Sequence, residues 1–426
     1  MEMYELLKEL FPICRSITGE GVRKTLAIIS RYVPELKVTE IPSGTQCFDW
    51  TIPEEWNIKS AFIRAPDGRI IADFAKNNLH VLSYSIPVEG YFSLEELNQH
   101  LYSDESRPGA IPYRTSYYER RWGFCISHNE RLSLKAGNYY VKIDSELKNG
   151  SLTIADAIIP GEIRKEIFFS CYLCHPSMAD DSLSGVVLAA RLYEHFKNRK
   201  NQHTFRFIFV PETIGAIAYL HKHGKEMKRN TNCGIVLTCL GAEGEFNYKK
   251  TRQGKHELDR IMENVLKHSN HKYKIYDFFL PGSDERQYSS PGFALPVGAL
   301  MHSYYSIPKY HSSEDNLDNV SEKCLQESFD VLRKTAEALD ENCKYKTLKP
   351  YCEPFLSKYD LCGSVGANVS MQESRKRIMY LLNFSDGYHS LLDIAEKGNF
   401  ELLNLADTAK LLESKGLLKK MKGDMK

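Results

Sequence analysis

Histidines and carboxylates that could bind a metal ion follow three apolar stretches of the sequence. The first stretch begins at Ile167 and ends at His175, and the paired acids Asp180 and Asp181 come shortly afterwards. A lone histidine at a strand end is more often structural than a ligand, but the acids so close behind it favour a ligand site. The spacing predicts that His175 and Asp181 share a divalent metal ion.

Two further polar clusters follow apolar stretches in the same way. A run rich in Phe, Ile and Val ends at Pro211, and the next residue is Glu212, whose carboxylate could bind a metal ion or act as a general base. The alternative is that Glu212 caps the helix beginning near Ile214, since acids favour helix N-termini. The third cluster contains His311, in a polar loop before Val320. Each cluster alone is a weak signal, and the three together favour a metal site.

An α/β fold is needed to bring these clusters together. Between residues 138 and 330, apolar runs typical of strands alternate with helical patterns. The predicted strands cover residues 139–143, 167–173, 205–210, 234–240 and 296–300. The alternation predicts a mostly parallel sheet flanked by helices, and the ligands of such sheets bind at the carboxyl ends of the strands.

The sequence pattern changes on both sides of this region, which predicts four parts. Residues 1–40 carry the apolar stripes of helices that join the α/β domain, and residues 41–130 have the short alternating segments of an inserted β-rich domain. The α/β domain is predicted at residues 131–348. Residues 349–426 contain three helical stretches and a final short strand, which is the layout of a winged helix.

The predicted insertion is rich in aromatic residues, and several of them stand beside arginines. Such aromatics can stack on bases or sugars, although packing within a small sheet explains them more often. The residues concerned include Trp50, Trp56, Trp122, Tyr113, Tyr117 and Tyr118. We therefore favour packing within the small sheet over ligand stacking.

Charge does not indicate a nucleic-acid or membrane partner. The chain has 56 Lys and Arg residues against 55 Asp and Glu, a formal net charge of +1. Residues 351–426 carry eleven basic and ten acidic residues, well short of the basic surface of a phosphate binder. A structural or protein-contact role for the winged helix is at least as well supported as DNA binding.

The N-terminal sequence and the cysteines favour the cytoplasm. The segment MEMYELLKELF has acids where a secretion signal needs basic residues, and no apolar run reaches the ~18 residues of a membrane span. Eleven cysteines without framework-like spacing favour reduced thiols. Cys171 and Cys174 form a CxxC within a predicted strand, where their side chains point to opposite faces, so packing is favoured over zinc binding. The oligomeric state is left open.

Residues 138–330 resemble the zinc aminopeptidases, whose fold is shared with glutaminyl cyclases. In that family a His, an Asp before a Ser-Gly pair, a Glu-Glu pair, another Asp and a late Tyr-His-Thr supply the metal site and the base. The resemblance makes His175, Asp181 and His311 the zinc ligands. It also implies that Asp284 and Arg286, in the segment GSDERQYSSPGF, orient the substrate.

The whole chain resembles, more narrowly, a bacterial family of aminopeptidase-like proteins with an inserted β domain and a C-terminal winged helix. The segments that carry this resemblance are ELFPICRSITGEGVR, CHPSMADDSLSG, PETIGAIAYL and GSDERQYSSPGF. The fold of that family implies peptidase function. The proteins with which its members occur imply a link to polysaccharide or cell-envelope metabolism.

Two departures from the peptidase pattern bear on the number of metal ions. A single Glu212 stands where the peptidases have Glu-Glu, so either the base or a ligand is missing. Thr238 begins the segment where the peptidases place their next Asp, which leaves Glu243 or Glu245 as the nearest substitutes. One zinc ion with an open position is expected, and a second is left open.

The resulting expectation is a zinc-dependent hydrolase, an aminopeptidase that acts on a peptide-like amide or on a small substrate containing an amino sugar. Glu212 is the expected catalytic residue and would shuttle the proton. The alternative is a degenerate peptidase scaffold that binds a ligand or a partner, with the winged helix in regulation or protein contact.

Overall fold

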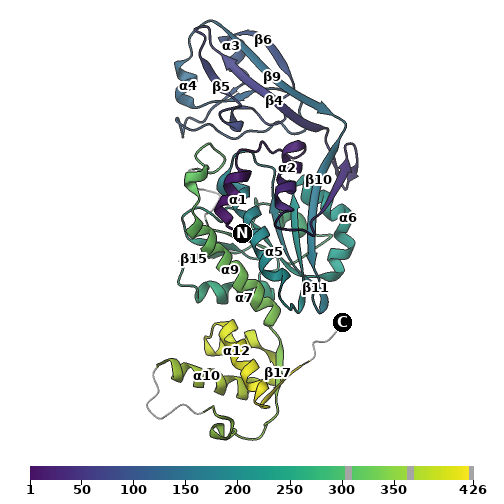
Figure 1. Cartoon of the computed structure of the whole chain (residues 1–426), viewed down its shortest axis with the longest axis vertical. Coiled ribbons are helices and arrows are strands. Elements are labelled where there is room, and N and C mark those ends of the chain that lie inside the picture. Colours follow the sequence, from purple (N-terminus) through teal and green to yellow (C-terminus); the bar gives the residue numbers. More distant parts are fainter. Residues whose placement is uncertain (303–308, 362–368, 422–426) are drawn as a thin grey trace. The chain divides into compact units, whose positions relative to one another are not determined.

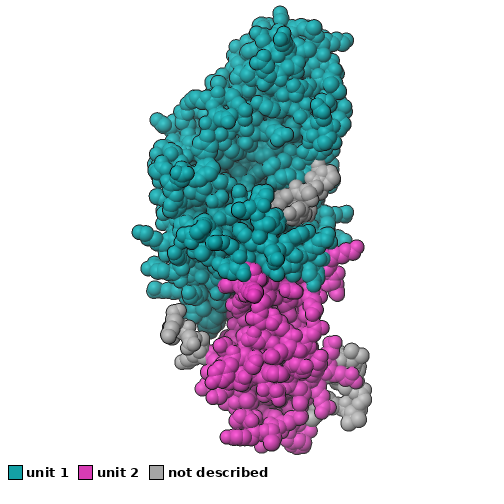
Figure 2. Space-filling model, turned by 180° about the vertical axis from the view of Figure 1, so that it is seen from behind, with its two compact units in different colours: residues 1–253, 273–329 teal, residues 254–272, 330–426 magenta. Residues whose placement is uncertain are grey.

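The computed structural model describes residues 1–302, 309–361 and 369–421. The chain divides into two units, which Figure 2 shows in different colours. Unit 1 contains residues 1–253 and 273–329, and unit 2 contains residues 254–272 and 330–426. No helix in the described part of the chain is both long and apolar enough to cross a membrane.

An eight-stranded sheet forms the centre of unit 1 (Figure 1). In spatial order its strands are β1 (Lys37–Pro42), β10 (Ser151–Ile159), β12 (His203–Val210), β11 (Ile163–Tyr172), β13 (Thr231–Leu237), β16 (Val297–Met301), β14 (Phe246–Lys249) and β15 (Tyr273–Tyr276). The strands β12, β11, β13 and β16 pair in parallel, whereas β1–β10, β10–β12 and β14–β16 are antiparallel. The predicted α/β fold is confirmed, with a sheet that is mixed towards its edges.

Helices cover both faces of this sheet. α5 (Gly185–Lys197) connects β11 to β12, and α6 (Ile214–Asn230) connects β12 to β13. Because β12 and β13 lie on opposite sides of β11 and such crossovers are right-handed, α5 and α6 lie on opposite faces. α1 (Met3–Leu10) packs against α5, and α8 (Glu285–Tyr288) packs against α6. α9 (Glu322–Glu341) begins in unit 1 and continues into unit 2.

This topology places the ends of β11 and β12 where α/β proteins bind ligands. The loops that follow the two strands leave the sheet towards opposite faces, which is the usual position of a site in such folds. The strands end level, since Tyr172 pairs with Val210. A Cβ on Gly185 would lie 2.3 Å from the carbonyl oxygen of Leu237, so only glycine lets α5 start this close to β13.

The insertion forms a sheet of its own, in the order β5-β4-β9-β6. Its strands and helices are β4 (Glu55–Arg64), β5 (Ile70–Asp73), β6 (Val88–Ser93), β9 (Asn138–Lys148), α3 (Leu94–Asn98) and α4 (His128–Ser133), with η1 (Asn78–His80) and the short pairs β2 (Gln46–Cys47) with β3 (Trp50–Thr51) and β7 (Leu101–Tyr102) with β8 (Phe124–Cys125). The strand predicted at residues 139–143 belongs here, so its assignment to the α/β sheet was wrong. Burial alternates along much of β9, which is typical of a sheet with one exposed face.

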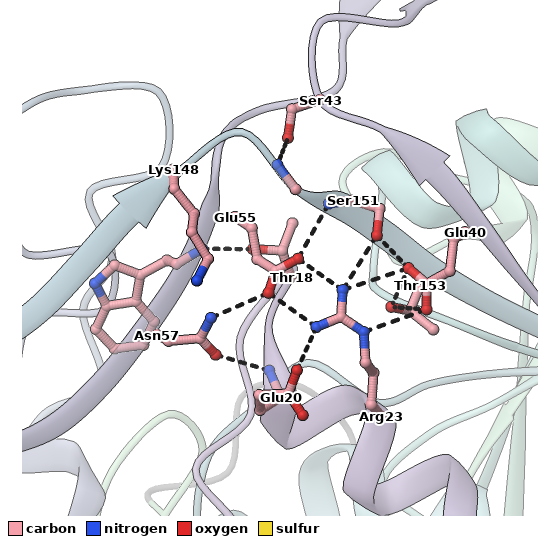
Figure 3. Close-up of polar contacts among 12 residues, drawn as sticks. Thr18, Glu20, Arg23, Glu40, Ser43, Glu55, Asn57, Lys148, Ser151 and Thr153 are labelled. Atoms are coloured by element: carbon pink, nitrogen blue, oxygen red, sulfur yellow. Dashed lines mark hydrogen bonds and ion pairs between the residues drawn. The ribbon is translucent and has the colours of Figure 1, made fainter.

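A network around Arg23 joins the insertion to the central sheet (Figure 3). Arg23, on α2 (Glu20–Ile29), donates to both carboxylate oxygens of Glu55 on β4, at 2.8 and 2.6 Å. It also donates to Glu40 on β1 at 3.3 Å and to the Ser151 hydroxyl on β10 at 3.1 Å. One guanidinium therefore ties together four elements that are far apart in sequence.

Unit 2 contains the winged helix that the sequence predicts. The helices of unit 2 are α7 (Glu257–Lys267), α10 (Val369–Phe384), α11 (Leu391–Gly398) and α12 (Leu402–Ser414), together with the later part of α9. Its sheet contains β18 (Asp386–Ser390), β17 (Lys344–Thr347) and β19 (Leu418–Lys420), and η4 (Leu356–Tyr359) follows β17 in the chain. The Ser390 side chain and Asp393 form a capping box at the start of α11, which explains why the helix begins there.

Candidate metal centre

The structure brings together the three predicted metal ligands, which lie in two loops more than a hundred residues apart. His175 follows β11, Asp181 lies in η2 (Ala179–Ser184), and His311 lies in the loop before η3 (Leu317–Asn319). One ligand atom from each residue lies within 4.8 Å of the others. Asp181 Oδ2 is 2.8 Å from His311 Nε2 and 3.9 Å from His175 Nε2.

These three residues fit a zinc ion. Asp181 Oδ2 and His311 Nε2 are buried and close, yet neither makes a hydrogen bond of acceptable geometry within the described residues. Tetrahedral ligands bound at 2.0–2.1 Å stand about 3.4 Å apart, between the two observed distances. Unsatisfied buried polar atoms are costly, and a shared cation would satisfy both of these.

Asp181 is held by groups that leave one of its oxygens facing the imidazoles. The Asp315 carboxylate accepts hydrogen bonds from the backbone N–H groups of Asp180 and Asp181, at 2.8 and 2.9 Å. The Tyr172 hydroxyl donates to Asp181 Oδ1, which leaves Oδ2 for the metal position. Burial alone would raise the pKa of Asp181, but the imidazoles of His175 and His311 outweigh it and lower this pKa to about 2.

The Cys174 thiol and the Arg15 guanidinium hold His175 in place. Cys174 Sγ lies 3.5 Å from His175 Nδ1, and Arg15 Nε donates to the His175 carbonyl at 3.1 Å. Cys174 therefore contacts the ring as well as packing, which the strand pattern did not predict. Burial lowers the pKa of His175 to about 4, so the imidazole is held in the neutral form that binds metal ions.

The inserted domain supplies one wall of the metal centre. The Tyr113 ring lies 5.1 Å from the His175 ring and 5.3 Å from the His311 ring, measured between centroids. The Tyr113 backbone N–H donates to the His311 carbonyl at 2.9 Å, and Ser313 N–H donates to the Ile111 carbonyl at 2.9 Å. Sequence reasoning assigned Tyr113 to packing within the insertion. No local signal could reveal this contact, because it depends on how the insertion folds back.

Glu212 faces the metal centre and does not cap α6. The N-terminus of α6 has no side-chain cap, so the capping alternative was wrong. Glu212 Oε1 accepts a hydrogen bond from the Ser283 hydroxyl at 2.8 Å, and Oε2 lies 3.8 Å from His175 Nε2. Burial and the negative charge of Asp181 raise the pKa of Glu212 to about 7, which suits an acid–base group at neutral pH.

A strained turn fixes the direction of Glu212. Thr213 has φ 61° and ψ −76°, and Ile214 N–H donates to the Glu212 carbonyl at 2.7 Å, which defines a γ-turn of the rare, strained kind. Thr213 N–H donates to Asp284 Oδ1 at 2.7 Å. Strained backbone of this kind is concentrated at functional sites.

The two residues expected to orient substrate lie beside this turn. Asp284 is 1% exposed, and burial together with the charge of Glu212 raises its pKa well above the usual range. Asp284 Oδ2 has no hydrogen-bond partner within the described residues. Arg286 is half-buried, and its Nε donates to the Ser283 carbonyl at 3.0 Å.

The positions where the peptidases carry further acids are occupied differently. The Thr238 hydroxyl is hydrogen-bonded to the Tyr172 hydroxyl, so a buried pair of hydroxyls lies beside Asp181 Oδ1. Glu245 forms an ion pair with Lys274. Neither Glu243 nor Glu245 belongs to the three-residue metal group.

Comparisons with known proteins agree with this architecture. Residues 4–342 match a family described as a domain of unknown function (DUF4910), and residues 343–420 match a winged helix-turn-helix family. A Clostridium acetobutylicum protein is 44% identical over 98% of this chain and 96% of its own length. That relative is provisionally named a polysaccharide biosynthesis protein with an aminopeptidase-like domain.

Solved structures support the same fold. The crystal structure of a provisionally assigned peptidase from Clostridium acetobutylicum is 43% identical, with a TM-score of 0.93 over 99% of this chain and 96% of that one. A zinc aminopeptidase from Bacillus subtilis is 13% identical, with a TM-score of 0.58 over 79% of this chain and 94% of that one. Because the family match and the 44% identical relative each cover most of the sequence, the chain belongs to the DUF4910 family of aminopeptidase-like proteins with a C-terminal winged helix.

Proposed function

We propose that the protein is a zinc-dependent hydrolase that cleaves a peptide-like amide at a free amino end. The observation that carries the proposal is the convergence of His175, Asp181 and His311 on one point, with the Glu212 carboxylate beside it. The aminopeptidase-like fold of the family supports the same reaction class.

The residues of the site have distinct roles in this proposal. The zinc ion would be held by His175 Nε2, Asp181 Oδ2 and His311 Nε2, and it would supply a Lewis acid for the amide carbonyl and for water. Glu212 Oε2 accepts a proton from the attacking water and passes it to the leaving amine. Asp284 holds the turn that directs Glu212, and Arg286 orients the substrate.

We propose that the candidate metal centre holds a single zinc ion. A bridging carboxylate needs both oxygens, but Asp181 Oδ1 already accepts a hydrogen bond from Tyr172. Thr238, hydrogen-bonded to the same phenol, supplies a hydroxyl where the peptidases supply a carboxylate. His175 and His311 therefore converge with Asp181 Oδ2 on one position.

The proposed substrate is a small peptide-like or amino-sugar-containing amide. Tyr113 and the paired imidazoles bound the site on one side, while the side chains of Glu212 and His311 remain 28% and 35% exposed. The substrate's reacting amide would approach from that exposed side. The name of the Clostridium acetobutylicum relative favours a substrate from polysaccharide metabolism.

Metal analysis and aminopeptidase assays on the full-length protein test the proposal. We expect one equivalent of zinc at this centre and hydrolysis of aminoacyl amides, with zinc lost from this centre in His175→Ala and activity lost in both His175→Ala and Glu212→Gln. Glu245→Gln is the matched control, because its carboxylate pairs with Lys274 away from the metal group. Unchanged metal content and activity in His175→Ala and Glu212→Gln would overturn the proposal.

A second candidate function is non-catalytic ligand binding on a degenerate peptidase scaffold. The replacement of a carboxylate by Thr238 favours it. The exposed face of α12 includes Asp407 and Glu413, and its Lys410 forms an ion pair with Glu341, so the winged helix is better suited to protein contact than to DNA. Binding of duplex DNA at low salt in a gel-shift assay would contradict that assignment.

A further inference from the structure

A second group of metal-binding residue types lies in unit 1 and shares no residue with the candidate metal centre. It consists of His302, Cys324 and Glu327, and one ligand atom from each lies within 4.8 Å of the others. In the described part of the chain, only this group and the candidate metal centre satisfy that distance. The group is independent of the proposed hydrolytic site.

Regular secondary structure positions each member of this group. His302 directly follows β16, its N–H donates to the Cys239 carbonyl at 2.8 Å, and its ring stacks on Phe246 with centroids 4.4 Å apart. Cys324 and Glu327 stand three residues apart in α9, so they lie on one face of the helix. The ligand set is therefore built on rigid elements, as a preorganised metal site requires.

The chemistry of the three side chains selects zinc. A thiolate and an imidazole are soft or borderline ligands that suit zinc, whereas magnesium and calcium prefer all-oxygen sites. A thiolate and a carboxylate also balance the charge of a divalent ion. That balance matters because His302 and Cys324 are only 3% and 4% exposed.

Binding of the ion would change the state of the thiol. Cys324 is buried, and a divalent metal ion deprotonates a thiol that binds it. The three side chains supply three ligands, and a further group would fill the fourth position of a tetrahedral zinc ion.

We propose that His302, Cys324 and Glu327 bind a structural zinc ion that links the end of β16 to the start of α9. The proposal predicts two zinc ions per chain, one in each group.

Cobalt substitution distinguishes the two sites without an activity assay. Full-length protein would be stripped of metal with a chelator and titrated with Co²⁺, because a cobalt–thiolate bond gives a strong near-ultraviolet charge-transfer absorption. Of the two groups only the second contains a cysteine, and Cys174 faces His175 Nδ1, away from the Nε2 that the first site would use. We expect one thiolate band per chain, retained in His311→Ala and lost in Cys324→Ser.

Matched variants separate metal binding from folding. Cys343→Ser removes a half-buried thiol from unit 2 and should keep the band. Glu327→Gln changes a partly exposed residue, so the fold should tolerate it. It should weaken zinc binding by about 10-fold or more, since loss of a residue that only supports a ligand already costs about 10-fold. Absence of the band in His311→Ala with native circular dichroism, or its persistence in Cys324→Ser, would overturn the proposal. Neither outcome would affect the hydrolase proposal, which depends on His175 and Glu212.

Discussion

Glu212 and Glu55 are both substantially buried glutamates of unit 1, and their surroundings shift the pKa values of their carboxyl groups in opposite directions. Hydrogen bonds from Arg23 lower the pKa of Glu55 to about 2, whereas burial and the charge of Asp181 raise the pKa of Glu212 to about 7. At neutral pH, Glu55 is thus firmly ionised and paired, while Glu212 can both accept and release a proton.

The regions around these two glutamates differ in the same sense. At the Arg23 junction the carboxylates of Glu55 and Glu40 are saturated with hydrogen bonds from Arg23 and its neighbours. At the candidate metal centre, Asp181 Oδ2 and Asp284 Oδ2 are buried and lack hydrogen-bond partners within the described residues. The junction is built for stability, and the metal centre keeps unsatisfied and strained groups that a bound ion and substrate would use.

The largest expected effect comes from replacing the carboxylate of Glu212 with an uncharged amide. Glu212→Gln keeps the shape but cannot accept a proton, so kcat/KM for aminoacyl amides should fall by about 10²–10⁴-fold. Because the folded-state pKa of Glu212 is raised, ionisation costs stability as pH rises through 7. The variant should therefore be at least as stable as wild type at pH 8, as measured by urea unfolding.

Glu55→Gln is the matched change in the other region. It should lower the free energy of unfolding and leave kcat/KM of the folded protein unchanged, because Glu55 is hydrogen-bonded to Arg23, Asn57 and Ser151, which lie outside the candidate metal centre. Full activity in Glu212→Gln, or loss of specific activity in Glu55→Gln, would contradict the division between the two regions.

The sequence singled out the residues that meet at the candidate metal centre better than it singled out their surroundings. His175 and Glu212 follow buried strands whose apolar runs are easy to recognise, and the ends of neighbouring parallel strands must lie together. The γ-turn at Thr213 has no such signal, because its strain is imposed by packing and by Asp284. Tyr113 was also missed as part of the site, since its position depends on the folded insertion.

The fold shows the same limit. Strands with continuous apolar runs and the helices of the winged helix were recognisable from the sequence. The strand at residues 139–143 was assigned to the wrong sheet, because a short alternating segment does not specify its partner. Arg23 was not singled out either, since the acids it joins are brought together only by tertiary structure.

Arg23→Met should give the next largest effect, on stability alone. It removes the guanidinium but keeps a long apolar side chain, and it leaves the Glu55 carboxylate without its cation. We expect a loss of about 2 kcal/mol in the free energy of unfolding, measured with urea. Arg31→Met is the control, because its ion pair with Glu9 is exposed and should matter by less than about 1 kcal/mol. Equal losses in the two variants would mean that the junction is not specially stabilising.

A pH series should reveal a somewhat smaller contribution from Glu55. A carboxylate with a depressed folded-state pKa stabilises the fold above its unfolded value of 4.5, and this contribution is lost as pH falls towards 2. The stability difference between wild type and Glu55→Gln should be about 1–2 kcal/mol at pH 6 and disappear near pH 2. A difference that stays constant with pH would assign the effect to packing.

The smallest expected effect concerns the strain at Thr213. A β-branched residue with φ 61° and ψ −76° costs about 1–3 kcal/mol, and glycine adopts this conformation freely at an entropic cost of about 1 kcal/mol. Thr213→Gly should therefore change stability little or raise it by up to about 1 kcal/mol, while kcat/KM falls because Glu212 is less firmly directed.

Asn399→Gly is the matched control, since Asn399 ends α11 with φ 54° in unit 2, in a conformation that asparagine tolerates. If Thr213→Gly destabilised the protein by more than the control, the threonine side chain itself would be the stabilising group and the turn would not store strain.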